Sequence, residues 1–366
     1  MSKVIKTRSF SLQQAQQLTD AGVNPLMAKL LVARGVESAE SLENTLKYLI
    51  HPSQLLNSHA MAQQLADCIG QQRQLLVVGD YDADGATATA VAVKGLRDMG
   101  AQVGFLVPNR FEYGYGLTPE IVDLAHQSSP DVILTVDNGI ASVDGVARAH
   151  ALGMQVLITD HHLPADITPD AACIVNPNQR GCDFPSKHLA GVGVMFYVLM
   201  ALRAELISRG MMVASQPYPL AEMLDLVALG TVADLVKLDR NNRILVEQGL
   251  RRIRAGAGCV GIQAILKCAS RDMHKVTAQD LGFYVGPRLN AAGRLDDMTL
   301  GIRCLLADNM QEAMHFAQQL HSLNIERRQI EAEMQQDAFA DLDTEAVKHD
   351  FTVSVFQPEW HQGVIG

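Results

Sequence analysis

Apolar runs and helix-like segments alternate through the middle of the chain. Short apolar runs occur at residues 75–78, 103–107, 132–136, 156–159 and 173–175. Segments with helical spacing lie between them, for example at residues 86–99, 119–126 and 142–152. Near-continuous apolar strands that alternate with helices are typical of a parallel sheet covered on both faces. The pattern therefore predicts an α/β domain, with a parallel sheet flanked by helices.

The pattern on either side of this domain is mostly helical. Residues 10–72 predict a helical N-terminal region, with a capping-box-like start at Ser11 and helices at 25–34, 38–49 and 60–73. Residues 188–268 are also helical in pattern, and 310–345 predict one long helix. Residues 286–295 contain Gly, Pro and Asn without helical periodicity, which favours a loop. Residues 351–356 predict the first strand of a further domain.

These segments give four predicted regions. They are a helical N-terminal region (1–72), an α/β domain (73–270), a helical connector that includes the 286–295 loop (271–345), and the start of a second α/β domain (346–366). The last residues end within what is predicted to be a strand and its turn, so we expect this second domain to be truncated.

Three carboxylates follow the first predicted strand, at Asp80, Asp82 and Asp84. Acids this close repel one another, and a divalent cation is the simplest compensating charge. A phosphate-binding P-loop does not fit, because Ala86 stands where a lysine is needed. An EF-hand is nearer in spacing, but Val91 replaces its final glutamate. A solvated acidic turn remains the plain structural alternative.

Two later strands end in similar chemistry. Asp137 follows the strand at 132–136, and the sequence Asp160–His161–His162 follows the strand at 156–159. An aspartate after a strand is often only a helix cap, but the carboxyl ends of parallel strands share one edge of the sheet. Carboxylates with imidazoles suit Mn²⁺ or Mg²⁺, and this many acids favours two ions. The sequence therefore predicts a two-metal hydrolytic site.

One more acid and two loops are candidates for the same site. Asp234 lies in the apolar segment 223–238, where a charge needs a metal or a partner such as Lys237 or Arg240. Within residues 108–120 we expect either a substrate-binding rim or ordinary packing, and within residues 286–295 either phosphate contacts or solvated side chains. The candidate substrate-binding residues are Arg110, Tyr113, Tyr115, Arg288, Asn290 and Arg294.

Composition limits the class of protein. The net charge is −10 and the pI is about 5.6, which argues against a generally basic nucleic-acid-coating surface but not against a local basic groove. We find no signal peptide and no apolar run that we expect to span a membrane. The six cysteines form no CxxC pair, so we expect free thiols and a cytoplasmic protein.

The motifs DYDADG (80–85), VDNG (136–139), DHH (160–162) and GTVADLV (230–236) stand in the order of the DHH phosphoesterase superfamily. With GPRLNAAGR (286–294) and WHQGVIG (360–366), the chain resembles the single-strand-specific DNA exonucleases of that superfamily. The resemblance implies two Mn²⁺ or Mg²⁺ ions and 5′ to 3′ degradation of single-stranded DNA to mononucleotides, in DNA repair and recombination. It also implies that the family's second domain, and an OB-type DNA-binding domain, are not complete here.

The resemblance also implies roles for individual residues. Asp82, Asp84, Asp137, His161 and Asp234 would be metal ligands, with Asp137 bridging the ions. Asp80 would be a further ligand, in place of a histidine found in other branches. His162 would contact the scissile phosphate, and Asp160 would orient the histidines; with Asp137 they are the candidate catalytic residues.

The implied partners are single-stranded DNA and, from the family, single-strand-binding protein and a RecQ-type helicase, with no membrane and a monomeric chain. Two other functions stay open. A small-molecule phosphodiesterase or pyrophosphatase would use the same metal site. A non-catalytic replication or repair scaffold is disfavoured, because the expected ligands all stand in the sequence.

Overall fold

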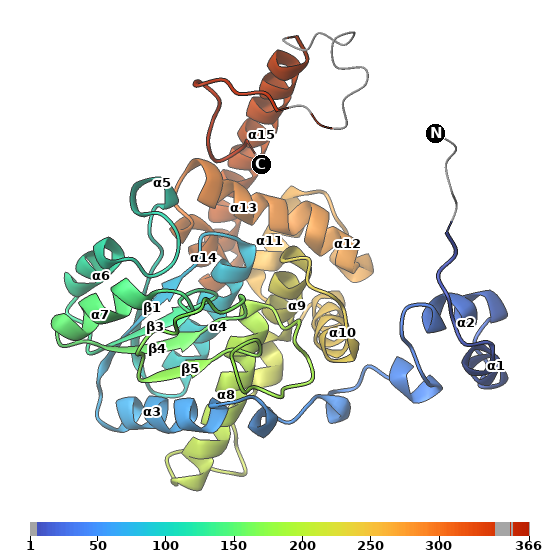
Figure 1. Cartoon of the computed structure of the whole chain (residues 1–366), viewed down its shortest axis with the longest axis horizontal. Helices are drawn as coiled ribbons and strands as arrows, with labels where there is room; N and C mark the ends of the chain where they lie inside the picture. The colour runs from blue at the N-terminus through green and yellow to red at the C-terminus, as the bar shows by residue number, and fades with distance from the viewer. Residues whose placement is uncertain (1–5, 341–351, 353, 366) are drawn as a thin grey trace.

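The computed structural model describes residues 6–340, 352 and 354–365. Its centre is a five-stranded parallel sheet in the order β2-β1-β3-β4-β5 (Figure 1). The strands are β1 (Gln74–Gly79), β2 (Gln102–Leu106), β3 (Val132–Val136), β4 (Gln155–Thr159) and β5 (Cys173–Val175). The chain moves outward from β1 to β2 and then returns to β3 on the other side of β1. This reversal opens a crevice at the carboxyl ends of the strands, where ligands bind in such sheets.

Alternate residues of each strand enter two different cores. Leu75 and Val77 of β1 pack with α3 (Ser58–Gly70), α4 (Ala83–Asp98) and α8 (Gly191–Ser208). Leu76 and Val78 face the other way, against α6 (Pro119–His126) and α7 (Val143–Ala151). Because both faces are covered, the strands are apolar along their whole length, and this is the pattern that made them recognisable in the sequence.

Helices complete the body beyond the sheet. They are α9 (Leu224–Ala233), α10 (Arg240–Arg254), α11 (Val260–Cys268), α12 (Ala278–Asp280), α13 (Gly286–Leu295), α14 (Thr299–Leu306) and α15 (Met310–Ala340). The predicted long helix is thus confirmed as far as Ala340 and projects from the body (Figure 1). A π-helical turn, Leu281–Val285, leads directly into α13.

Helix α8 is long and apolar enough to cross a membrane by length and composition, contrary to the sequence prediction. However, 67% of its 18 residues are buried inside the protein. It packs between α3, α4 and α9 and contributes Val192, Phe196 and Leu199 to the larger core. These features are those of a core helix, whose apolar surface is covered by the protein itself.

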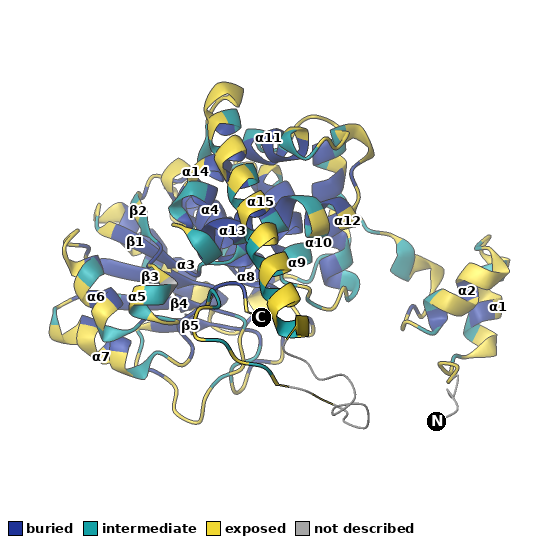
Figure 2. Cartoon of the chain, turned by 90° about the horizontal axis from the view of Figure 1, so that it is seen from above, coloured by how far each residue is buried: buried dark blue, intermediate teal, exposed yellow. Residues whose placement is uncertain are grey.

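The N-terminal region begins with a pair of helices that lies apart from the body (Figures 1 and 2). Helix α1 (Leu12–Asp20) begins at Ser11, whose side chain accepts a hydrogen bond from the Gln14 N–H, as the capping signal predicted. Helix α2 (Pro25–Val32) packs against it around Leu18. The predicted helix at 38–49 is wrong, because this stretch forms only two short 3₁₀ turns, Ala39–Leu42 and Leu46–Tyr48.

Three further segments differ from the prediction or lie partly outside the described residues. The predicted loop at 286–295 is helix α13. Its small residues serve close packing, since a Cβ added to Gly293 would lie 1.9 Å from the backbone oxygen of Tyr81. In the predicted strand at 351–356, residues 351 and 353 lie outside the described residues, and residues 354–356 form no strand. The stretch 108–120, predicted as a loop, contains the short helix α5 (Arg110–Tyr113) and the start of α6.

Candidate metal centre

Three aspartates enter the crevice from the end of β1 and the start of α4. Asp80 follows the strand and is 8% exposed. Asp82 caps α4 by accepting a 2.9 Å hydrogen bond from the Gly85 N–H. Asp84, one turn into the helix, accepts hydrogen bonds from the N–H groups of Gly191 and Val192, at 2.6 and 3.0 Å. The positive end of α8 therefore faces Asp84.

Asp137 enters from a tight turn after β3. Its backbone has φ of 63°, in the left-handed region, and its N–H continues the ladder to Thr159 of β4. The turn is held by Asn138, whose side-chain amide donates to the carbonyls of Val78 and Val136 at 3.2 and 2.9 Å. This bracing fixes Asp137 between the ends of β1 and β4, with its side chain fully buried.

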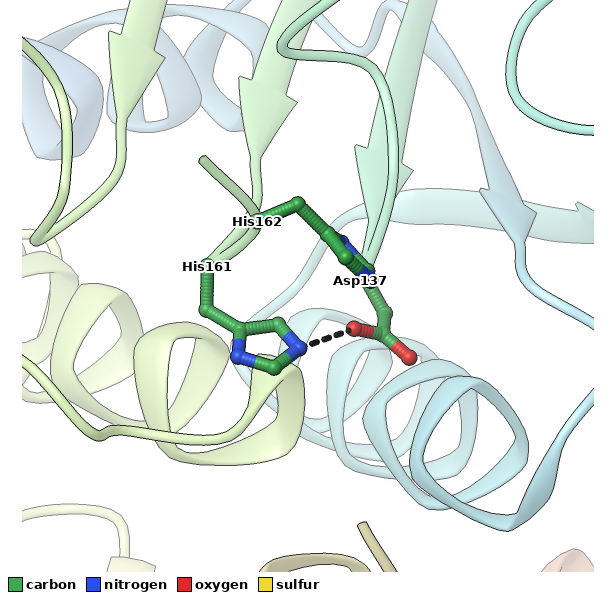
Figure 3. Close-up of side chains that lie close together, drawn as sticks. All are labelled: Asp137, His161 and His162. Carbon is green, nitrogen blue, oxygen red and sulfur yellow. Dashed lines mark ion pairs between the residues drawn. The ribbon is translucent and has the colours of Figure 1, made fainter. Parts of the chain in front are cut away.

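The two histidines leave the end of β4 and have different surroundings. Asp160 accepts hydrogen bonds from both histidine N–H groups and from His162 Nδ1, the last at 2.7 Å. His162 is thereby held at the cavity wall, where its Nε2 lies 3.2 Å from the hydroxyl of Tyr115. The ring of His161 turns inward, and its Nε2 lies 3.1 Å from Asp137 Oδ1 (Figure 3).

Asp234 reaches the same place from the C-terminal end of α9. Its Oδ2 lies 3.6 Å from His161 Nε2, and Asp84 Oδ2 lies 3.9 Å from the same nitrogen. The structure therefore brings together acids and histidines from four separate segments, at residues 80–84, 137, 160–162 and 234. In the described part of the chain, the ion-pair contacts of these carboxylates are all with histidines.

The candidate ligands fall into two separate triads. In one, ligand atoms of Asp84, His161 and Asp234 lie within 4.8 Å of one another, and in the other those of Asp80, Asp82 and Asp137 do. A third grouping joins Asp137 with both histidines. Because Asp137 Oδ1 contacts the histidine of the first triad, this carboxylate lies between the two.

The carboxylates repel one another in this buried setting. Burial, with the charge of Asp82, raises the pKa of Asp80 to about 7. Burial and the same neighbouring charge raise the pKa of Asp234 to about 6. Burial and mutual repulsion raise the pKa values of Asp84 and Asp137 well above their ordinary values. A divalent cation would relieve this repulsion, since opposite charge favours the ionised form.

The histidines are tuned in opposite directions. Burial, with the charge of His162, lowers the pKa of His161 to about 4, which keeps the ring neutral and able to act as a ligand. The hydrogen bond to Asp160 raises the pKa of His162 to about 9, so this ring carries positive charge at neutral pH. Burial alone would raise the pKa of Asp160, but its hydrogen bonds with His162 lower it.

Two buried polar atoms at this site lack the hydrogen-bond partners that buried atoms normally have, and a bound cation would account for them. Asp137 Oδ1 and His161 Nε2 are both buried, and neither has a hydrogen-bond partner among the described residues. Buried polar atoms normally have partners. A carboxylate oxygen and a neutral imidazole nitrogen that face each other without a hydrogen bond are suitable donors to a shared metal site.

A cavity of about 780 Å³ opens beside this cluster. Its lining includes Asp80, Asp82, Asp160, His162 and Tyr115, together with Asn290 and Arg294 of α13. Asn290 also accepts a 2.7 Å hydrogen bond from the Ala83 N–H at the start of α4. The cavity lining thus combines acids with an amide and a guanidinium.

Three of the predicted substrate-binding residues are not placed in this cavity. Arg288 lies on the opposite face of α13, 8% exposed, and donates to the Tyr284 carbonyl and to His321. Residues 290 and 294 share a helix face that 288 cannot share. Tyr113 packs against the core under α6 and α7, as the packing alternative predicted. The side chain of Arg110 is not described by the structure.

Sequence reasoning missed one residue of the site, Gly191. A Cβ added there would lie 2.5 Å from Asp137 Oδ1, while its own N–H binds Asp84. Only a glycine allows the start of α8 to approach both carboxylates. The signal in the sequence was LAGVG at 189–193, a Gly-containing helix start, but nothing local indicates what it faces.

Comparisons with known proteins identify the family. The family model described as "DHH family, N-terminal domain" matches residues 74–231. A solved exonuclease RecJ bound to manganese is 35% identical, with a TM-score of 0.74 over 85% of this chain and 75% of that one. The chain belongs to the RecJ branch of the DHH family. The family model covers the five strands and the acids and histidines that follow β1, β3 and β4, and it ends before Asp234 and α13.

Other RecJ proteins are similar over nearly the whole chain. RecJ of Thermus thermophilus in complex with Mn²⁺ matches with a TM-score of 0.82 at 32% identity, over 97% of this chain and 50% of that one. The single-stranded-DNA-specific exonuclease RecJ of Salmonella typhimurium is 50% identical over 94% of this chain and 61% of its own length. The chain spans about three-fifths of the length of this protein and of RecJ of Escherichia coli, which is 48% identical.

Proposed function

We propose that this chain carries the metal site of a single-strand-specific 5′ to 3′ DNA exonuclease that releases mononucleotides. The observation that supports this most directly is the pair of ligand triads, which meet where Asp137 of one contacts His161 of the other. All six residues that the sequence suggested as ligands belong to these triads: Asp80, Asp82, Asp84, Asp137, His161 and Asp234. Two ions held in this way suit the hydrolysis of phosphodiesters.

The donor set favours Mn²⁺ or Mg²⁺, because it contains five carboxylates, one neutral imidazole and no thiolate. Asp84, His161 and Asp234 would hold one ion, and Asp80 and Asp82 would hold the other, with Asp137 shared. When bound, the ions supply positive charge to the phosphate and lower the pKa of water.

The remaining side chains act on the phosphate and its strand. His162 carries its positive charge at the cavity wall, where it donates to a phosphate oxygen and stabilises the charge of the transition state. Asp160 fixes the direction of that donor through Nδ1. Arg294 and Asn290, which line the same cavity, also bind the phosphate.

The acidic net charge is compatible with this function, since bound ions, together with His162 and Arg294 of the cavity lining, would supply positive charge to the phosphate. The six free cysteines fit a cytoplasmic enzyme in a reducing environment. Action as a monomer, with recruitment by single-strand-binding protein and a RecQ-type helicase, stays a prediction of the family resemblance.

The test is digestion of single-stranded DNA labelled at the 5′ or the 3′ end, in Mn²⁺, with a duplex of the same sequence as a control. We expect early release of the 5′ label and no cleavage of the duplex. The matched variant Asp137→Asn keeps the shape of the side chain but removes its charge, and should lose both cleavage and Mn²⁺ binding in calorimetry.

Two outcomes would overturn the proposal in different ways. Hydrolysis of pyrophosphate or a dinucleotide, without cleavage of longer DNA, would move the function to a small-molecule phosphodiesterase of the same family. Absence of Mn²⁺ binding by the folded wild-type chain would remove the metal site itself.

A further inference from the structure

One helix connects the cavity with an exposed aromatic side chain outside it. The π-helical turn Leu281–Val285 runs straight into α13. About half of this segment is buried, and residues 282–284, 287, 290, 294 and 295 are accessible. Among the accessible residues, 283, 287, 290 and 294 are spaced by four, three and four residues, which places them along one face of a helix. Asn290 and Arg294 of this face line the cavity.

The far end of that face is Phe283, whose side chain is 70% exposed. An exposed phenylalanine alone is ordinary. This one, however, continues the row of residues that begins at the proposed phosphate site. It lies seven residues from Asn290, which is roughly 10 Å along a helix axis. At about 3.4 Å per stacked nucleotide, that distance corresponds to about three nucleotides.

A second exposed apolar side chain lies at the edge of the metal site. Leu235 directly follows Asp234 and is 84% exposed. Its φ of 58° is in the left-handed region, at the position after a helix end where glycine is usual. A leucine there strains the backbone and exposes an apolar side chain to water, and no packing in the described residues compensates for either cost.

The segments that carry these two side chains touch each other. A Cβ added to Gly282 would lie 3.3 Å from Val232, and one added to Gly286 would lie 3.3 Å from Ala233. The π-helical turn therefore lies against the last turn of α9, which delivers Asp234 to the ligand triad. π-helical turns are rare and frequently occur at functional sites.

We propose that Phe283 and Leu235 form an apolar platform that holds unpaired bases of the DNA strand on the 3′ side of the scissile phosphate. This rests on the proposed exonuclease function. The DNA strand would follow the accessible face of the helix. Its scissile phosphate would lie at Asn290 and Arg294, and the following nucleotides would extend along the helix toward Phe283. Lys237, exposed two residues after Leu235, supplies positive charge for the backbone.

The platform also gives a physical basis for strand selection. An aromatic face binds any base, whatever the sequence, as long as the face of that base is free. In a duplex each base is stacked between its neighbours and paired, so its face is not available to Phe283. Discrimination against duplex DNA then begins before the scissile phosphate reaches the metal site.

The experiment compares the wild-type chain with Phe283→Leu, which keeps an apolar side chain, and Phe283→Tyr, which keeps the ring. The substrates are a 5′-phosphorylated 20-nucleotide strand and a dinucleotide too short to reach residue 283. We expect Phe283→Leu to raise the KM for the 20-nucleotide strand relative to the KM for the dinucleotide about tenfold, at unchanged kcat on the long strand. This is the scale of one lost base stack. Phe283→Tyr should keep the wild-type ratio.

Phe339→Leu is the matched control, because Phe339 is 72% exposed on α15, away from the cavity lining. It should leave the ratio unchanged, and Leu235→Ala should raise it by less than Phe283→Leu. A strand with 2-aminopurine at successive positions gives a direct readout. Its fluorescence should be quenched by stacking at one position near the third nucleotide, and Phe283→Leu should restore it.

Separate results refute the platform and the exonuclease function. If the wild type digests the strand and Phe283→Leu shows the same KM ratio and fluorescence, the platform is refuted and the function stands. If Phe283→Leu weakens both substrates equally, the residue is structural and the platform is again refuted. If the wild type hydrolyses only the dinucleotide, the exonuclease function fails, and the platform fails with it.

Discussion

Substituting Gly191 by alanine tests whether the metal centre depends on the close approach of α8. An added Cβ would lie 2.5 Å from Asp137 Oδ1 and 2.6 Å from its Cγ. Non-bonded contacts of this kind rest at about 3.5 Å, so Asp137 or the start of the helix must move by about 1 Å. A displacement of about 1 Å in a positioning group costs about 100-fold in rate.

The effect on stability should be far smaller than the effect on rate. Alanine favours a helix over glycine by up to about 1 kcal/mol, and overpacking costs about 1–3 kcal/mol. We therefore expect Gly191→Ala to lower the free energy of unfolding by no more than about 2 kcal/mol while it lowers kcat about 100-fold.

The assay pairs Mn²⁺-dependent cleavage and Mn²⁺ calorimetry with urea unfolding. Gly193→Ala is the matched control on the same helix, because its added Cβ would lie 3.1 Å from the flexible end of Leu189. It should keep wild-type turnover. A folded Gly191→Ala protein with wild-type turnover and Mn²⁺ affinity would show that the position of Asp137 does not limit the reaction.

Two further predictions concern an aspartate at the site and one remote from it. Asp160→Asn keeps an acceptor for the backbone but loses the charge that holds His162, so we expect about a 10–100-fold loss of activity with Mn²⁺ binding retained in calorimetry. Asp280 accepts hydrogen bonds from Thr277 and a 2.6 Å ion pair from Arg271; burial alone would raise its pKa, but these partners lower it. A carboxylate whose pKa is lowered in the folded state stabilises the protein only above its unfolded pKa of 3.8. Asp280→Ala should therefore lower the free energy of unfolding by about 1–2 kcal/mol at neutral pH. Urea unfolding should show that this difference from the wild type disappears as the pH falls below 3.8.

The sheet was predictable because its strands are buried on both faces. The strands 132–136 and 173–175 were predicted with their observed bounds, since a fully apolar run leaves little choice of ends. The acids could then be grouped, because parallel strands bring their carboxyl ends to one edge. The separation of His161 from His162 followed from the family resemblance, and the contacts with Asp137 and Asp160 now give each ring its own surroundings.

The prediction failed where small residues serve contacts distant in the sequence. Residues 286–295 were interpreted as a loop because Gly, Pro and Asn usually mark turns. In the structure, Gly293 instead lets α13 approach Tyr81, more than two hundred residues earlier in the chain. Without a helix there was no face to separate Arg288 from Arg294, so both were assigned to the substrate.

The wide spacing of the ligands, from Asp80 to Asp234, links metal affinity to folding. No short segment of the unfolded chain holds one of the triads, so an ion binds the native state far better than the unfolded one. By mass action, an ion present at 100 times its dissociation constant adds about 2.7 kcal/mol to the stability of the native state. Contacts between residues so far apart in sequence also form slowly. The supply of metal would therefore set how much of this chain survives as folded protein, in addition to how fast it works.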